Sequence, residues 1–162
     1  MYTRFCAALA RLCLKVGVAG LGLLIAAVLY QVIGRYVFND TPTWAESGAV
    51  LLVLYVTMLG MAVGVRDAGH IGLESLVMLL PEKWQRRVEL LIHTLVGIFG
   101  VLMVQSGWLW ANAKWGEKKP MLPVPDGIDY VPVVIAGALI VLFSIEHIVA
   151  IVRGQTVEPA WN

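Results

Sequence analysis

The sequence predicts an all-α membrane protein: four transmembrane helices in a single membrane domain over residues 1–162. Of its 162 residues, 59% are hydrophobic and only 14% are charged, and the mean hydropathy is +0.80. Soluble domains are about half apolar and about a quarter charged, and a chain of this length has too much surface to hide the excess. Four apolar runs are each long enough to cross a bilayer, which takes about 20 residues.

The first predicted span covers residues 16–34 and follows a basic, amphipathic N-terminal stretch. Arg4, Arg11 and Lys15 fall within a narrow arc of a helical wheel. Such a start imitates a secretory signal, but the apolar run is long and no small-x-small cleavage pattern follows it. We therefore expect a retained first helix, with the basic stretch lying before it as a helix on the cytoplasmic surface.

The second predicted span covers residues 45–65 and begins just after Pro42. Thr43 can cap this helix, and Glu46 three residues later can reach back to it. This capping arrangement would explain Glu46 without any further role. Gly60 and Gly64 form a GxxxG pattern, which lets another helix approach closely but is common in membrane helices.

The third and fourth predicted spans cover residues 89–111 and 131–152. Before the third, residues 71–87 place apolar side chains at helical spacing with charges off that face, which predicts an amphipathic segment in the membrane interface. A cytoplasmic loop with a helical turn is the alternative. Tryptophans cluster at the far end of the third span, as in an interfacial aromatic belt. The connection over residues 114–130 is rich in proline and is predicted to be an ordered loop.

The distribution of basic residues predicts the orientation of the chain. Four spans place both termini on one side of the membrane, together with the connection between the second and third spans. This side carries eight of the Lys and Arg residues, and the opposite side carries four. Cytoplasmic segments carry the excess of Lys and Arg, so both termini are expected in the cytoplasm.

Several classes of function are excluded by composition and by the placement of charges. A net charge of +1 argues for no nucleic-acid partner. The span centres carry no ionisable residues, whereas carriers usually place them at mid-membrane. No HExxH or GxSxG motif occurs, and Cys6 and Cys13 lie about 10 Å apart on a helix, beyond disulfide reach. We expect no catalytic residue, no metal site and no cofactor.

One pair of histidines allows an alternative function. His93 lies near the start of the third span, and His147 lies near the end of the fourth, next to Glu146. If these spans are antiparallel neighbours, both imidazoles lie at a similar depth and could ligate a b-type haem. The alternative function is therefore a membrane cytochrome subunit. The simpler interpretation is two interfacial histidines bonded to backbone or facing lipid headgroups.

With its residues placed, the chain resembles the small membrane subunit, of the DctQ type, of tripartite ATP-independent periplasmic (TRAP) transporters. The likeness extends over residues 16–153. It rests on an ordered set of short matches: Gly34-Arg35-Tyr36-Val37-Phe38-Asn39, Trp44-Ala45-Glu46, Leu59-Gly60-Met61-Ala62, Arg66, Gly69-His70-Ile71, Leu80-Pro81 and Tyr130-Val131-Pro132.

The resemblance implies a function and partners. It implies a small, non-catalytic scaffold subunit in the bacterial inner membrane. The partners would be a large elevator-type permease subunit of the DctM type, which holds the substrate and sodium sites, and a periplasmic substrate-binding protein. The substrates of such systems are organic acids, such as dicarboxylates, sugar acids or sialic acids.

Five residues at the span ends are candidates for contacts with a partner subunit or with lipid: Arg35, Trp44, Glu46, Arg66 and His70. Arg35 and Glu46 flank a short turn and could pair at the lipid boundary, which would fix the angle between the first two spans. The family often has two adjacent acids at this turn, whereas Ser47 follows Glu46 here. Glu46 alone would therefore carry that role. Generic anchoring at the interface is the simpler interpretation of all five.

Overall fold

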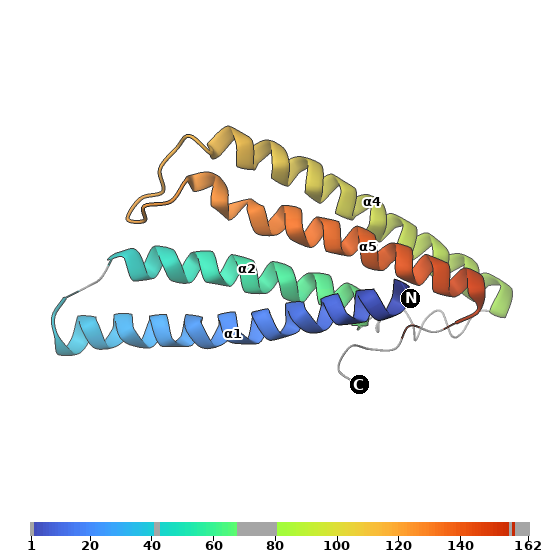
Figure 1. Ribbon diagram of the computed structural model, residues 1–162, viewed down its shortest axis with the longest axis horizontal. Helices are drawn as coiled ribbons and strands as arrows, with labels where there is room; N and C mark the ends of the chain where they lie inside the picture. Colours follow the sequence, from blue (N-terminus) through green and yellow to red (C-terminus); the bar gives the residue numbers. More distant parts are fainter. Residues whose placement is uncertain (1, 41–42, 68–80, 156, 158–162) are drawn as a thin grey trace.

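Four long helices make up most of the chain, as predicted. The computed structural model describes residues 2–40, 43–67, 81–155 and 157. Within them there is no β-strand, only one isolated bridge pair in a loop. The elements are α1 (Tyr2–Val37), α2 (Thr43–Asp67), α4 (Glu82–Lys114), the short 3-10 helix η1 (Asp126–Asp129) and α5 (Val131–Arg153) (Figure 1).

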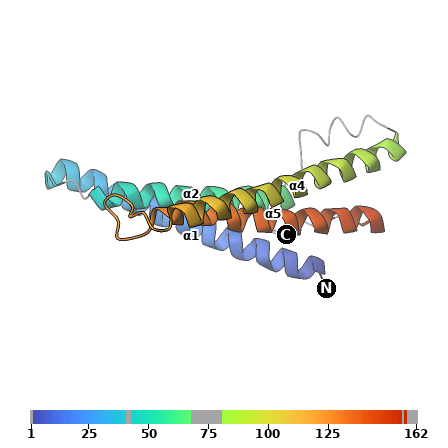
Figure 2. The ribbon, with the colours of Figure 1, turned by 90° about the horizontal axis from the view of Figure 1, so that it is seen from above.

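The helices stand side by side in the order α1, α2, α5, α4 (Figures 1 and 2). Helix α1 is antiparallel to α2 and α4 is antiparallel to α5, whereas the two inner helices, α2 and α5, run parallel. Helix α5 packs against α4 on one side and α2 on the other, and α1 packs mainly on α2. The start of α1 and the end of α5 lie at the same end of the molecule. Because the helices form a row, α1 and α4 are its two outer members.

Most of the apolar surface of this row is open to the surroundings. Of the most apolar stretch of each helix, only 6% is buried in α1, 11% in α2 and 17% in α4, against 44% in α5. In water this exposure would be strongly unfavourable, because contiguous exposed apolar patches are rare on soluble monomers. The structure therefore fits a hydrocarbon environment, with α5 as the central helix.

Helix α1 is a single unbroken helix from Tyr2 to Val37. We expected the basic stretch to form a separate helix on the membrane surface, and the structure differs because no proline interrupts the chain between Arg4 and the apolar run. Its 36 residues extend over about 54 Å, well beyond the roughly 30 Å of hydrocarbon. The basic turns of α1 therefore continue the axis of the membrane helix.

The segment before α4 is only partly described. Residues 82–87, about the last third of the predicted amphipathic segment, form the first turns of α4. Residues 71–80 of that segment, and the candidate residue His70, lie outside the described residues.

Local chemistry explains where the helices begin and end. After α1, the backbone N–H groups of Phe38 and Asp40 both donate to the carbonyl oxygen of Gly34, and Asn39 adopts a positive φ of 54°, as helix-terminating residues do. Helix α5 has a proline in its first turn and ends at Arg153, and the following Gly154, with a φ of 67°, caps it.

Small residues hold α1 to the rest of the bundle. Most residues of α1 that are not exposed recur at alternating spacings of three and four, which places them on one stripe of the helix: Cys6, Ala10, Cys13, Gly17, Gly20, Leu24, Ala27, Gln31 and Gly34. A Cβ added at Gly20 would lie 2.7 Å from Cγ2 of Val56. Both cysteines are free and buried in this seam.

Candidate functional site

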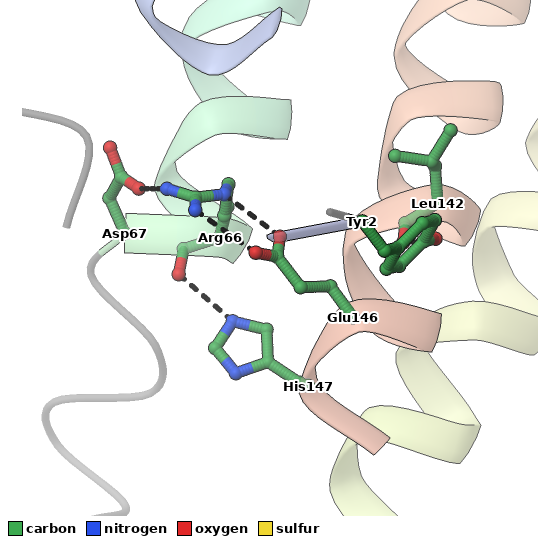
Figure 3. A network of polar contacts seen from close by, with 6 residues as sticks. All are labelled: Tyr2, Arg66, Asp67, Leu142, Glu146 and His147. Atoms are coloured by element: carbon green, nitrogen blue, oxygen red, sulfur yellow. Dashed lines mark hydrogen bonds and ion pairs between the residues drawn. The ribbon is translucent and has the colours of Figure 1, made fainter. Parts of the chain in front are cut away.

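A buried ion pair joins α2 to α5. The Arg66 guanidinium donates from Nε to Oε2 of Glu146 over 2.9 Å and from its second terminal nitrogen to Oε1 over 3.0 Å (Figure 3). The two side chains are 2% and 0% exposed. Bidentate pairs of this kind combine charge with fixed geometry. Because both charges have left water, each depends on the other for compensation.

Asp67 adds a second carboxylate to the same guanidinium. Its Oδ1 accepts from Arg66 over 2.6 Å, and the Asp67 side chain is 1% exposed. Its other oxygen is buried and accepts no hydrogen bond from the described residues. The Phe143 ring lies 5.9 Å from the guanidinium carbon, a cation–π distance. Arg66 is therefore enclosed by two acids and an aromatic ring.

The remaining two helices reach the same place through an imidazole pair and a phenol. His147 lies with Nε2 2.9 Å from the carbonyl oxygen of Arg66, and since a carbonyl can only accept, this nitrogen carries a proton. His93 of α4 stacks on His147, with ring centroids 4.2 Å apart and planes within 6°. Tyr2 of α1 donates its hydroxyl to the carbonyl oxygen of Leu142 over 2.8 Å.

We call these six residues the polar cluster: Tyr2, Arg66, Asp67, His93, Glu146 and His147. Each of the four long helices contributes at least one of them. Its charged members are directed at one another in Figure 3. In the described part of the chain, no group of three or more His, Cys, Asp or Glu side chains converges as a metal site would require. Because its members come from all four long helices and bond across them, the cluster can fix the helices relative to one another.

The histidine pair does not have the geometry of a haem site. The structure does bring His93 and His147 together, as the sequence suggested. However, imidazole lone pairs lie in the plane of the ring, so two axial ligands must approach the iron edge-on from opposite sides. Rings stacked face to face at 4.2 Å leave no space for a porphyrin between them, and Nε2 of His147 is already engaged with Arg66. The cytochrome alternative is therefore not supported.

The other candidates from the sequence lie at the opposite end of α1 and α2. Arg35 and Glu46 are both exposed, and no ion pair joins them in the described part of the chain. Trp44 is 53% exposed, with its ring centroid 6.0 Å from that of Tyr30. Their contacts with lipid or partner remain predictions. Sequence reasoning missed the pairing of Arg66 with Glu146, although both stand near the same-side ends of their spans.

The fold and the cluster together define a multi-pass membrane protein whose buried charges tie its helices to one another. The family model of the DctQ component of tripartite ATP-independent periplasmic transporters matches residues 24–154. The chain therefore belongs to this family of small permease subunits, as the resemblance indicated, and it is a multi-pass protein of the inner membrane.

Three relatives are similar to this chain. The C4-dicarboxylate TRAP transporter small permease protein DctQ of Vibrio cholerae is 28% identical over 105 residues, which are 62% of this chain and 45% of the relative. The sialic acid TRAP transporter permease protein SiaT of Haemophilus influenzae is 36% identical over 90 residues, which are 56% of this chain and 14% of the relative. A putative TRAP transporter small permease protein of Haemophilus influenzae is 25% identical over 152 residues, covering 91% of this chain and 92% of the relative.

The chain thus spans less than half the length of the first two of these relatives. Their names are those of transporter permease proteins, which assigns the chain to transport and indicates no enzyme family.

Proposed function

We propose that this chain is the small, non-catalytic scaffold subunit of a sodium-coupled transporter that takes up organic acids. In this proposal a large elevator-type permease subunit binds and moves the substrate, and a periplasmic binding protein delivers it. The chain supplies a fixed layer of helices that anchors the large subunit in the bilayer. The names of its relatives, which refer to C4-dicarboxylates and sialic acid, support an organic acid as the substrate.

The observation that carries this proposal is the internal pairing of the buried charges. A subunit that moves an ion or substrate needs ionisable groups near the middle of the membrane. Here Arg66 is the penultimate residue of α2 and Glu146 lies in the last third of α5, and each neutralises the other. A cluster of this kind supports a static element of the transporter better than a moving one.

The lengths of the relatives support a large partner subunit. In the sialic acid permease protein, the stretch similar to this chain is only 14% of the polypeptide. A unit like this one and a much larger permease body therefore belong to one chain in that protein. We infer that this chain binds a separate permease subunit, similar in size to the permease body of that protein.

The exposed residues near the turn between α1 and α2 fit a role in anchoring. Arg35, Trp44 and Glu46 present their side chains to the surroundings, where they can contact headgroups or the partner. An exposed ion pair between Arg35 and Glu46 would contribute on the order of 0–1 kcal/mol to the stability of the fold. Arg66 faces Glu146 instead, which supports a role inside the chain. His70 is proposed to anchor the cytoplasmic side.

We propose that both termini lie in the cytoplasm, because their side of the membrane carries the excess of Lys and Arg. Green fluorescent protein fused after Asn162 should fluoresce, and alkaline phosphatase at the same position should be inactive. Alkaline phosphatase inserted after Lys118, in the loop before η1, should be active. Alkaline phosphatase that is active after Asn162 and inactive after Lys118 would show that the orientation is inverted.

The chain alone should transport nothing. Reconstituted in liposomes with an inward sodium gradient, it should take up neither labelled succinate nor labelled sialic acid above empty vesicles. Vesicles with the chain, the large permease and the binding protein should accumulate a labelled organic acid only with sodium outside. Accumulation by the chain alone would contradict the scaffold proposal, and uptake by the whole system without sodium would contradict its ion coupling.

A further inference from the structure

Helix α4 presents a stripe of exposed side chains that includes two amides. Residues at alternating spacings of three and four lie on one face of a helix, and five such residues are exposed along α4: Ile98, Val101, Gln105, Trp108 and Asn112. We call this set the amide stripe. The residues of α4 that pack on α5, such as Gly100, Met103 and Gly107, lie on another face. The amide stripe is thus on the outer side of an outer helix of the row.

A cavity of about 290 Å³ borders the C-terminal part of this stripe. It lies between α4 and α5, at the opposite end of these helices from the polar cluster. Trp108 and Asn112 line it together with Trp115, Val134 and Ile135. Trp108 is 64% exposed and Ile135 is 41% exposed, so the cavity adjoins the outer surface of the row. A bulky apolar side chain from outside could enter it.

Gln105 is poorly suited to a surface that faces acyl chains. It lies nine residues before Lys114, the last residue of α4, and inside the predicted span 89–111. Its amide has two donor hydrogens and an acceptor oxygen, and in the described part of the chain it makes no hydrogen bond. An unsatisfied amide in hydrocarbon costs several kcal/mol. A neighbouring helix could satisfy it, whereas an acyl chain could not.

The outer face of α1, at the other edge of the row, has the opposite character. Its exposed residues from 16 to 29 are all apolar or glycine, with Val18, Ile25 and Leu29 each more than half exposed. Acyl chains cover such a surface without leaving a polar group unsatisfied. The two edges of the row are therefore suited to different neighbours.

We propose that the amide stripe and the adjoining cavity are the docking surface for a transmembrane helix of the large permease subunit. This inference rests on the proposed function and adds the site of contact. The docked helix extends the row beyond α4, donates to or accepts from the Gln105 amide, and fills the cavity with an apolar side chain. The α1 edge remains in contact with lipid.

Photocrosslinking tests this assignment with the full chain. Benzoyl-phenylalanine is placed at position 101 or 105 in α4, or at position 25 or 29 in α1 as a matched control, and the chain is co-expressed with its cognate large permease. Irradiation of membranes should give a crosslink of the mass of both subunits from the α4 positions only. Crosslinks to the permease from α1 alone, or from α4 only to lipid or to a second copy, would overturn the docking surface.

A second measurement tests the amide itself. Gln105→Met keeps the length of the side chain and removes its hydrogen bonds. Interhelical polar contacts in membranes are modest, so the dissociation constant for the large permease in detergent should rise about three- to twenty-fold. Leu29→Met on α1 should leave it unchanged. If wild-type subunits never co-purify, the proposed function fails; if they co-purify and Gln105→Met binds as tightly, only the docking surface fails.

Discussion

Glu146→Ala is expected to destabilise the folded chain by about 3–5 kcal/mol, because it removes one partner of a buried ion pair. Of its two acidic partners among the described residues, Arg66 would keep Asp67, at a position where the Arg66 side chain is 2% exposed. The free energy of unfolding in mixed detergent micelles, titrated with dodecyl sulfate and followed by circular dichroism, measures the loss. A variant that unfolds at the same dodecyl sulfate fraction as the wild type would contradict the prediction.

Glu46→Ala is the matched control. Glu46 is also an acid near a helix end, but it is exposed and forms no ion pair in the described part of the chain. Its removal should change the free energy of unfolding by less than about 1 kcal/mol. The contrast between two glutamates of the same chain separates burial from charge.

A neutral version of the cluster tests whether compensation is the cause. When a whole buried ionic group is replaced by neutral residues of similar volume, stability is often retained. Arg66→Met, Asp67→Asn and Glu146→Gln together should therefore recover most of the stability lost in Glu146→Ala. Arg66→Met with Glu146→Gln should recover less, because the Asp67 carboxylate would then be buried without its cation.

Hydropathy was sufficient to predict the four helices but not their order in space. Each span is long, apolar and bounded by Pro, Gly or charged residues, so α1, α2, α4 and α5 appear close to where they were expected. The row order depends on which faces complement one another. That information lies in pairs of residues distant in sequence, such as Gly20 and Val56.

The polar cluster could be predicted only in part for the same reason. Arg66 was recognised as a polar residue at a span end, where interfacial anchoring and an interhelical ion pair have the same sequence pattern. Only the adjacency of α2 and α5 distinguishes them, because it brings Glu146 within 2.9 Å. His93 and His147 were placed at a common depth correctly, but their stacking depends on side-chain rotation, which spacing does not determine.

A glycine motif in the sequence likewise does not show where two helices approach closely. The GxxxG at Gly60 and Gly64 predicted a possible close approach, yet a Cβ added at either position would meet nothing within 4 Å. A close backbone approach between two of the long helices lies instead between α4 and α5. A Cβ added at Gly137 would lie 2.7 Å from the carbonyl oxygen of Gly100, although no GxxxG pattern marks that position.

Gly137→Ala is therefore also expected to lower the free energy of unfolding strongly. The added methyl group meets backbone and the Cβ of Met103 at 2.9 Å, neither of which can rotate away, so α4 and α5 must separate. Overpacking of this kind costs about 1–3 kcal/mol, and the free energy of unfolding in the same detergent titration should fall by that amount. Because α5 also carries Glu146, the displacement should weaken the contact with Arg66 as well.

Gly60→Ala provides the matched control for that experiment. It makes the same chemical change in a membrane helix of the same protein, but into open space. Alanine favours the helix over glycine by up to about 1 kcal/mol, so this variant should be as stable as the wild type or slightly more so. Equal losses in Gly137→Ala and Gly60→Ala would mean that helix propensity, and not the contact between α4 and α5, determines the result.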